Sequence, residues 1–283
     1  MAVSKIDREM IMDALNEHAS NKEILKDDSK VVRTGFKDLD CMLGGLRRGQ
    51  TYLLGARPSM GKTDFAFNVI KHVAINEGKR VLFFSLDSSK RRLISRFAGF
   101  ISKIGEGFAN DKSEKANNMM ENAINEIDKA EIYLDDIPNI SIEEITASCS
   151  AFESTGKQPD LIIVDYLQLI SSLEAERVRA CVELSEIAKR LNCAVLILSQ
   201  ISRGVEERED HRPVLEDLLE SSIKSVVDNV LFLYRDDYYN NKSKLKGLAD
   251  ICVAKSVNGD RGTIALGYIH EYQRFCNITK VNE

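Results

Sequence analysis

Eight consecutive residues have the types and the order of a loop that binds nucleotide phosphates. They read Ala56-Arg57-Pro58-Ser59-Met60-Gly61-Lys62-Thr63. An apolar run, Thr51 to Leu54, enters the loop, and an amphipathic segment, Asp64 to Ile75, leaves it, which is the strand, loop and helix context that such a motif requires. Backbone N–H groups of the loop and of the helix N-terminus would face the phosphates. Lys62 would reach the β and γ phosphates, and the Thr63 hydroxyl would hold Mg²⁺.

The first position of the loop departs from the common pattern, because Ala56 stands where a glycine is usual. A competing interpretation takes Gly61, Lys62 and Thr63 as the start of an ordinary helix. The apolar strand before these residues and the amphipathic helix after them favour the phosphate loop.

A carboxylate at the end of a second apolar run complements this loop. Leu161 to Val164 form the run, and Asp165 follows it. A buried strand fixes such an acid so that it can orient Mg²⁺ through water. An acid at a strand end also occurs in ordinary turns at a sheet edge. Asp165 therefore indicates a Mg²⁺ site only in combination with the phosphate loop.

Two more strand-end residues are candidates for the chemistry of the γ-phosphate. Asp87 follows the strand Val81 to Ser85 and would polarise the attacking water, although an aspartate there can also cap the next helix. Gln200 closes another strand, and its amide would sense the γ-phosphate or the water by donating one hydrogen bond and accepting another. A solvated loop amide is the alternative for Gln200.

Apolar runs alternate with helical segments from Gly35 onward, which predicts an α/β fold with a mainly parallel sheet covered on both faces. The predicted strands are Thr51 to Leu54, Val81 to Ser85, Ile132 to Leu134, Leu161 to Val164, Ala194 to Ser199, Val230 to Leu233, Ile251 to Ala254 and Thr263 to Tyr268. The predicted helices are Lys62 to Asn76, Lys90 to Ile104, Glu114 to Ala130, Ile142 to Glu153 and Leu173 to Leu191. Ligands of open sheets lie beyond the carboxyl ends of the strands, so all these candidates are expected in one site.

Composition sets broad limits on the class of protein. The chain has 283 residues, of which 43% are hydrophobic, and a net charge of −5. Its apolar runs fall short of the ~20 residues that cross a bilayer, and Met1 to Arg8 lack the layout of a signal peptide, so we expect a cytoplasmic protein without a membrane. Six scattered cysteines and four dispersed histidines predict reduced, mostly buried thiols and no zinc site. The net negative charge argues against a broad basic surface and permits nucleic acid to bind only at local loops.

Two segments are expected to lie outside the main elements. Residues 1–33 carry an apolar stripe at helical spacing, followed by charged residues, and predict a helix on a tether that covers either its own domain or a neighbouring subunit. Residues 34–283 would then form the nucleotide-binding domain. The charged stretch Arg203 to Pro213 predicts a mobile loop. Its arginines would contact phosphates of a nucleic acid or would simply be solvated; they are Arg203, Arg208 and Arg212.

Taken together, these motifs resemble the helicase domain of DnaB-type replicative DNA helicases. The matching strings include the phosphate loop, Thr34-Gly35-Phe36-Lys37-Asp38-Leu39-Asp40, Asp165-Tyr166-Leu167-Gln168-Leu169, Leu198-Ser199-Gln200, Leu231-Phe232-Leu233-Tyr234-Arg235 and Asn258-Gly259. The resemblance implies a RecA-like core with an N-terminal linker helix that docks on the next subunit. It also implies a ring, usually hexameric, around single-stranded DNA, with ATP and Mg²⁺ between subunits. Ala56 is usual in this family, and Arg235 is assigned to nucleotide binding.

The resemblance also exposes three departures. Asp87 stands where the family has a glutamate, and a misplacement of ~1 Å can cost on the order of 10²-fold in rate. Val257 occupies the place of an arginine finger, which is worth ~10³- to 10⁵-fold, while Lys255, which would reach the neighbour's γ-phosphate, is kept. The family's Arg-Glu-Ser-Gly DNA loop reads Leu219-Glu220-Ser221-Ser222, which leaves Glu220 as its candidate DNA contact.

Three functions follow from these patterns. The first is a DnaB-like motor that hydrolyses ATP and translocates on single-stranded DNA during replication, with weakened turnover. The second is an ATP-binding interaction protein of the same fold that assembles with a helicase and regulates it. The third, a recombinase or clock-type ATPase of the wider RecA class, is disfavoured by the string Asp165 to Leu169. The resemblance leaves open a helicase loader or other replication proteins as partners.

Overall fold

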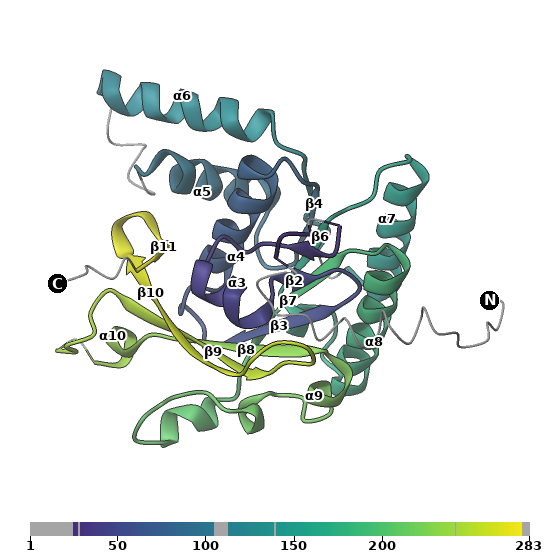
Figure 1. Ribbon diagram of the computed structural model, residues 1–283, viewed down its shortest axis with the longest axis vertical. Coiled ribbons are helices and arrows are strands. Elements are labelled where there is room, and N and C mark those ends of the chain that lie inside the picture. Colours follow the sequence, from purple (N-terminus) through teal and green to yellow (C-terminus); the bar gives the residue numbers. More distant parts are fainter. Residues whose placement is uncertain (1–24, 28, 105–112, 139, 241, 279–283) are drawn as a thin grey trace.

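The computed structural model describes residues 25–27, 29–104, 113–138, 140–240 and 242–278. Its main feature is one nine-stranded sheet with the order β11-β10-β9-β8-β3-β7-β6-β4-β5 (Figure 1). The strands are β3 (Thr51–Ala56), β4 (Val81–Ser85), β5 (Ile132–Asp135), β6 (Leu161–Asp165), β7 (Ala194–Gln200), β8 (Asn229–Tyr234), β9 (Leu248–Lys255), β10 (Gly262–Ile269) and β11 (Arg274–Asn277). A separate antiparallel pair joins β1 (Val31–Val32) and β2 (Leu46–Arg47).

The sheet is parallel from β5 to β8 and antiparallel from β8 to β11. Strands β3, β4, β6 and β8 are buried along their whole length, as expected for parallel strands covered on both faces. In contrast, burial alternates along β9 and β10, which is typical of antiparallel strands with one face toward solvent. The predicted α/β fold with a mainly parallel sheet is confirmed, and β11 is a strand that was not predicted.

Five long helices cover the sheet, and all five were predicted. They are α4 (Lys62–Ile70), continued by a π-helical turn over Lys71–Asn76, α5 (Lys90–Ser102), α6 (Glu114–Asp128), α7 (Ile142–Ser154) and α8 (Glu174–Arg190). Shorter helices are α3 (Lys37–Leu43), α9 (Ile223–Val226) and α10 (Asp236–Tyr239), with 3-10 turns at Leu167–Leu169, Arg203–Glu207, Leu215–Asp217 and His270–Tyr272. The expectation of an irregular loop from Arg203 to Pro213 is therefore wrong at its start, where Arg203–Glu207 form a turn of helix.

The apolar core has two halves, one on each face of the sheet. Leu54 faces the half that contains side chains of α4 and α5, and its neighbour Leu53 faces the half that contains side chains of α7 and α8. Figure 1 shows α5 and α6 stacked outside α4 on one side, with α7 and α8 on the other. This alternation holds β3 rigidly at the centre of the sheet, and β3 leads into the phosphate loop.

Two expectations from composition concern membrane-spanning helices and thiols. No helix within the described ranges has both the length and the apolar character to cross a membrane. All six cysteines are free thiols, and three of them, Cys149, Cys181 and Cys193, are buried. Cys41 is exposed, so the expectation of mostly buried thiols holds for half of them. Residues 1–24, which carry the predicted linker helix, lie outside the described residues.

Gly55 in β3 lies where no side chain fits. A Cβ at this position would be 2.8 Å from Cε1 of Phe232 and 2.9 Å from Cγ2 of Ile201. Both neighbours are buried, so we expect Gly55→Ala to lower the free energy of unfolding by about 1–3 kcal/mol in urea denaturation. Gly204→Ala is the control, because its nearest contact would be Ser202 at 3.5 Å, and its effect should stay within about 0.5 kcal/mol. Equal losses in the two variants would contradict the packing argument.

Glu77, directly after the π-helical turn, joins this helix to the N-terminal segment through ion pairs. Its carboxylate lies 2.8 Å from Arg33 and 2.7 Å from Lys79. Burial raises the pKa of Glu77, but hydrogen bonds from His72, Lys79 and Arg33 outweigh burial and lower this pKa from 4.5 to about 2. A lowered pKa means that the ionised group stabilises the fold above the unfolded-state pKa and loses this effect as the pH falls toward the folded-state pKa.

We therefore expect the stability difference between the native chain and Glu77→Gln to be constant above about pH 5 and to shrink as the pH falls from about 4.5 toward 2. Urea denaturation over this pH range measures it. A difference that does not depend on pH would show that the ionised carboxylate of Glu77 contributes nothing.

Candidate nucleotide site

The carboxyl ends of the central strands bring the predicted residues to one edge of the sheet. Ala56, at the end of β3, pairs with Gln200, at the end of β7. Asp165, at the end of β6, pairs with Ser85, at the end of β4. Parallel strands end at the same edge, so the phosphate loop and both strand-end side chains share one site, as the order of motifs predicted.

The phosphate loop turns sharply into helix α4. Ser59 and Gly61 both have left-handed backbone conformations, with φ of 61° and 102°. Gly61 is the N-cap residue of α4, and no side chain caps the helix. The first-turn N–H groups therefore keep their hydrogen-bonding capacity, and the positive end of the helix dipole points at the loop. A phosphate group satisfies both conditions.

Lys62 folds back over its own loop. Its Nζ donates hydrogen bonds to the carbonyl oxygens of Ala56 (3.0 Å) and Arg57 (3.2 Å). Only 9% of the residue is exposed, and burial lowers the pKa of Lys62 to about 8. Two neutral carbonyls compensate a buried ammonium group poorly, so an anionic phosphate oxygen would be a better partner.

Thr63 and Asp165 make direct contact across the site. The Thr63 hydroxyl donates to Oδ2 of Asp165 over 2.7 Å, and burial raises the pKa of Asp165 to about 6. A hydroxyl and a carboxylate are hard oxygen donors of the kind that Mg²⁺ prefers. A cation beside them would favour the ionised carboxylate that burial opposes. The donor set therefore fits Mg²⁺, for which Thr63 would be a ligand and Asp165 would hold the ion directly or through water.

Asp87 stands exposed near these residues, in the segment after β4. The backbone N–H of Leu86 donates to the carbonyl oxygen of Asp165 (2.7 Å), which fixes this segment beside β6. The charge of Asp87 also acts on the pKa of both Lys62 and Asp165. Helix α5 begins after Ser89, which is its N-cap residue. The alternative interpretation of Asp87 as the helix cap is therefore wrong.

Gln200 is held through its backbone by Gln168, a residue that received no role in the sequence analysis. The N–H of Gln200 donates to Oε1 of Gln168 (2.9 Å), and Nε2 of Gln168 donates to the Ser199 hydroxyl (2.9 Å). Gln200 is the last residue of β7 and is partly buried, so it is not a freely solvated loop amide. The string Asp165 to Leu169 was the only sequence signal that pointed to Gln168.

The Arg57 side chain ties the phosphate loop to the segment after β7. It donates to the carbonyl oxygen of Ile201 (2.9 Å) and to Oε1 of Glu206 (2.9 Å). Glu206 lies in the helical turn Arg203–Glu207. Sequence reasoning missed this contact because the two partners are 149 residues apart.

The β10–β11 hairpin supports the start of α4. The Tyr268 hydroxyl donates to Oδ2 of Asp64 (2.8 Å), and Arg96 donates to Oδ1 of Asp64 (3.0 Å). A Cβ on Gly61 would lie 3.1 Å from Phe275. No sequence pattern indicated this support, because it joins α4 to α5 and to strands near the end of the chain.

Arg235 also belongs to this support. It is 6% exposed, its guanidinium lies 4.0 Å from the ring centroid of Tyr268, and its Nε donates to Asp237 (3.2 Å). The structure therefore places Arg235 behind the Tyr268 ring, on the side of the sheet where β8 ends. Its role in nucleotide binding stays a prediction.

Lys255 does not join the site of its own chain. It pairs with Val230, near the start of β8, and so lies at the edge of the sheet opposite to the phosphate loop. Its Nζ donates to the carbonyl oxygens of Lys224 (2.8 Å) and Val227 (2.6 Å). Val257, two residues later, is 56% exposed. Any action of Lys255 on a γ-phosphate therefore requires a second subunit.

The three candidate DNA-binding arginines differ in their availability. Arg208 makes paired hydrogen bonds with both carboxylate oxygens of Asp217, each 2.7 Å long. Arg212 donates to Asp250 over 2.6 Å. Arg203 is exposed and takes part in no ion pair within the described ranges. Two of the three arginines thus neutralise carboxylates of their own chain, and the DNA-binding role of all three stays a prediction.

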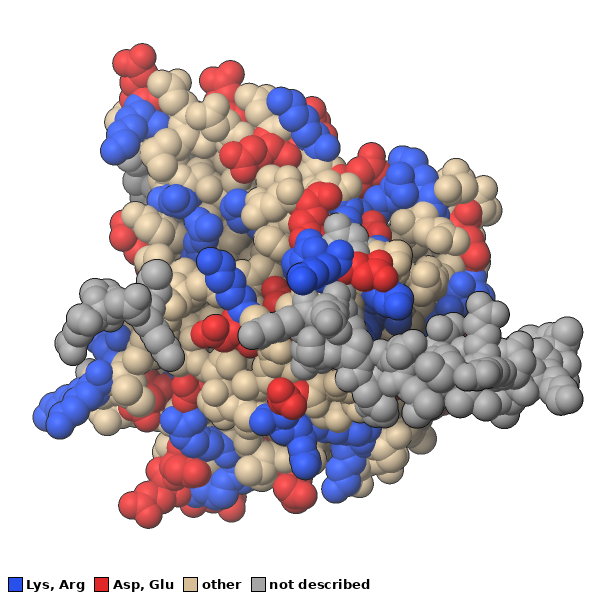
Figure 2. Space-filling model, in the orientation of Figure 1, with Lys and Arg blue, Asp and Glu red and all other residues tan. Residues whose placement is uncertain are grey.

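The prediction for Glu220 also needs correction. Glu220 is 1% exposed and forms an ion pair with Arg177 of α8. Its side chain therefore faces the interior and is not available for a direct contact with DNA. Charges of both signs mix over the face shown in Figure 2, which agrees with a net charge of −5 and with local contacts rather than a broad basic surface.

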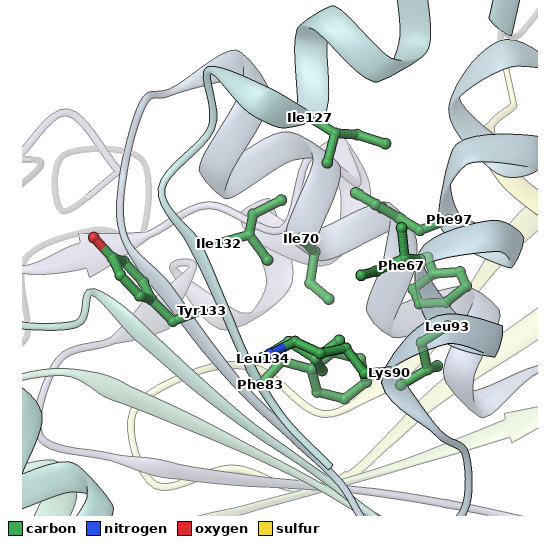
Figure 3. Close-up of a pocket in the computed structure, with 11 residues that line it drawn as sticks. Phe67, Ile70, Phe83, Lys90, Leu93, Phe97, Ile127, Ile132, Tyr133 and Leu134 are labelled. Carbon is green, nitrogen blue, oxygen red and sulfur yellow. The ribbon is translucent and has the colours of Figure 1, made fainter.

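A separate cavity of about 370 Å³ lies between the sheet and helices α5 and α6 (Figure 3). Its lining is mainly apolar and includes Phe67, Phe83, Leu93, Phe97 and Ile132. Such a lining offers phosphate groups too few polar partners. The strand edge with Lys62 is therefore a better candidate for a nucleotide site than this cavity.

Comparison with known proteins identifies the family of this chain. The family model described as DnaB-like helicase C terminal domain matches residues 31–277. The chain belongs to this family. Two relatives are the replicative DNA helicase DnaC of Bacillus subtilis and the replicative DNA helicase DnaB of Geobacillus stearothermophilus, each 36% identical over 95% of this chain and 62% of the relative. The chain thus spans about three fifths of the length of these DnaB-like relatives.

Solved structures agree with the DnaB-like assignment. A DnaB-like replicative helicase, studied with its interactions with primase, superposes with a TM-score of 0.86 at 30% identity, over 98% of this chain and 68% of that one. A second solved structure, of an ATPase domain, gives the same TM-score and identity over 98% and 100% of the two chains. A KaiC-like protein from Pyrococcus horikoshii, at 14% identity and a TM-score of 0.62, shares the fold. The expected RecA-like core is confirmed.

Removal of the Lys62 charge tests the phosphate loop directly. We expect Lys62→Ala to weaken binding of a fluorescent ATP analogue by roughly 10- to 100-fold or more, because a charge-assisted hydrogen bond to phosphate is lost. Lys129→Ala, at the end of α6, is the matched control and should bind like the native chain. Unchanged affinity in Lys62→Ala would mean that the phosphate loop is wrongly assigned.

Proposed function

We propose that this chain is the ATP-driven motor part of a replicative DNA helicase, which hydrolyses ATP and moves along single-stranded DNA. The observation that carries the proposal is the convergence of Lys62, the Thr63–Asp165 contact and Gln200 at one strand edge. Membership of the DnaB-like family supports it. The site would take ATP with Mg²⁺, and replication of DNA would place the protein in the cytoplasm.

Each residue of the site would have a separate role in ATP binding or hydrolysis. The loop N–H groups and Lys62 would hold the phosphates, and Thr63 and Asp165 would hold Mg²⁺, which neutralises charge that develops on the phosphate oxygens. Asp87 would orient the attacking water and accept its proton. Gln200 would bind the γ-phosphate or the water through its amide. Arg235, behind Tyr268, would fix the wall of the site near the nucleotide.

Assembly completes this proposal. A ring of copies, hexameric by resemblance, would hold ATP between neighbours and enclose the DNA. Lys255, at the opposite edge of the sheet from its own phosphate loop, would then face the neighbour's ATP. Residues 1–33 would supply the linker helix that docks on the next subunit, and a helicase loader would be a further partner.

A second candidate function is an ATP-binding partner that regulates a helicase without efficient turnover. Two observations favour it. Lys255 is bonded to two carbonyl oxygens of its own chain, and Val257 presents an exposed apolar side chain where a cation would stabilise the γ-phosphate. The shorter side chain of Asp87 adds to the same expectation of slow hydrolysis.

ATP turnover distinguishes the two functions. For the motor, we expect hydrolysis at roughly 1 s⁻¹ or faster, stimulated by single-stranded DNA, and a further gain in the double variant Asp87→Glu and Val257→Arg. The turnover rate would rise on the order of 10-fold or more, because Val257→Arg restores a positive charge and Asp87→Glu restores a longer side chain. Tight ATP binding without turnover in the native chain, with turnover only in the double variant, would reject the motor in favour of the regulator.

A further inference from the structure

We infer that Arg261 is a catalytic residue for a second copy of this chain, because its guanidinium binds the γ-phosphate of the ATP that this second copy holds. Arg261 lies between β9 and β10 in residues 256–261, which are called the β9–β10 turn below. The inference rests on the proposed function, since it requires copies that hold ATP between them. It names the residue that supplies a cation which the site of a single chain lacks.

The arginines around the phosphate loop are paired with carboxylates of their own chain. The pairs are Arg57 with Glu206 (2.9 Å), Arg96 with Asp64 (3.0 Å) and Arg235 with Asp237 (3.2 Å). Lys62, by contrast, donates to two neutral carbonyl oxygens and can turn to a phosphate. Phosphoryl transfer spreads negative charge over the oxygens of the γ-phosphate, and a second cation beside them speeds it. That cation has to come from outside the chain.

Arg261 is available for this role. It is exposed, and it takes part in no ion pair or side-chain hydrogen bond with the other described residues. Lys255, directly before the turn, is bound instead to the carbonyl oxygens of Lys224 (2.8 Å) and Val227 (2.6 Å). Val257 carries no charge. The guanidinium of Arg261 stays protonated in proteins and presents a planar fork of N–H groups that matches phosphate oxygens.

The backbone of the β9–β10 turn is fixed against α3. The N–H of Asp260 donates to the carbonyl oxygen of Met42 (2.9 Å). A Cβ on Gly259 would lie 2.8 Å from Cα of Leu43, so the turn approaches the end of α3 too closely for a side chain at this position. Arg261 follows directly after these contacts. A catalytic cation needs such support, because a misplacement of ~1 Å can cost on the order of 10²-fold in rate.

The position of the turn in the sheet excludes the ATP of its own chain. Lys255, the last residue of β9, pairs with Val230 near the start of β8. The phosphate loop follows the other end of the neighbouring parallel strand β3. A ring of identical copies joins two different surfaces of the chain at every interface. In the proposed ring, the edge with Arg261 therefore meets the phosphate loop of the next copy.

Arg261 acts on the phosphoryl group without changing the proton balance of hydrolysis. The oxygen of the attacking water forms a bond to the γ-phosphorus, while the bond from this phosphorus to the β–γ bridging oxygen breaks and leaves its electron pair on ADP. The proton of the water passes to Asp87. The N–H groups of Arg261 donate to γ-phosphate oxygens and stabilise the charge that grows on them in the transition state.

Steady-state ATP turnover of Arg261→Ala tests the assignment. We expect kcat to fall by about 10²-fold or more and KM to change by less than about threefold, because the contact strengthens in the transition state. Arg261→Lys keeps the charge without the planar fork and should lose on the order of 10-fold. Asn258→Ala is the matched control, since it removes another exposed side chain of the same turn, and its turnover should stay within about twofold of native.

Two rescue experiments separate a catalytic cation from a structural one. In Arg261→Ala, the added change Val257→Arg returns a cation to the same turn and should raise turnover by about 10-fold or more, a larger gain than it gives in the native chain. Mixing Arg261→Ala with Lys62→Ala should give more turnover than the two variants give separately. In the mixture, an intact phosphate loop of one variant meets Arg261 of the other.

The outcomes separate this inference from the proposed function. A native chain that binds ATP without turnover overturns the motor and the inference together. A native chain with turnover overturns the inference alone if Arg261→Ala hydrolyses ATP within about twofold of the native rate. Loss of affinity for a non-hydrolysable ATP analogue, or of assembly in analytical ultracentrifugation, alongside turnover would show a structural role and reject the catalytic one. A mixture without any gain would reject action between copies.

Discussion

The contact between Thr63 and Asp165 is the interaction on which the rest of the structure depends. It joins the first turn of α4 to the end of β6, and both partners are held by a sheet that is buried on its two faces. Burial disfavours the ionised form of Asp165 and raises its pKa to about 6. Groups kept in such surroundings are typical of functional sites. The phosphate loop, Asp87 and Gln200 all take their positions from the same strand edge.

The sequence predicted this edge well because its signals are local. A buried parallel strand is a continuous apolar run, and the residue after it lies at the carboxyl end of the sheet, so Asp165 and Gln200 were found from their neighbours alone. The supports of the site were not found for the opposite reason. Tyr268 reaches Asp64 across 204 residues, and Gln168 reaches Glu220 across 52. No pattern of period or spacing encodes such contacts, and β11 was missed because a strand of four residues, of which only Phe275 is buried, carries little pattern.

Electrostatic compensation within the chain bears on the DNA contacts expected from the sequence. Arg208 and Arg212 have carboxylates of their own chain within 2.7 Å, and Glu220 is buried against Arg177. Two ion pairs of this kind fix the segments that follow β7. Arg57 joins the phosphate loop to Glu206, and Arg177 joins α8 to Glu220.

A structure of this chain with magnesium and a non-hydrolysable ATP analogue tests the central claim most directly. We expect the β and γ phosphates within hydrogen-bond distance of Lys62 and of the first-turn N–H groups of α4. We also expect Mg²⁺ at the Thr63 hydroxyl, near Asp165, with Lys62 released from the carbonyls of Ala56 and Arg57. A nucleotide bound at any other place, or a saturated complex in which Lys62 still contacts only those carbonyls, would contradict it.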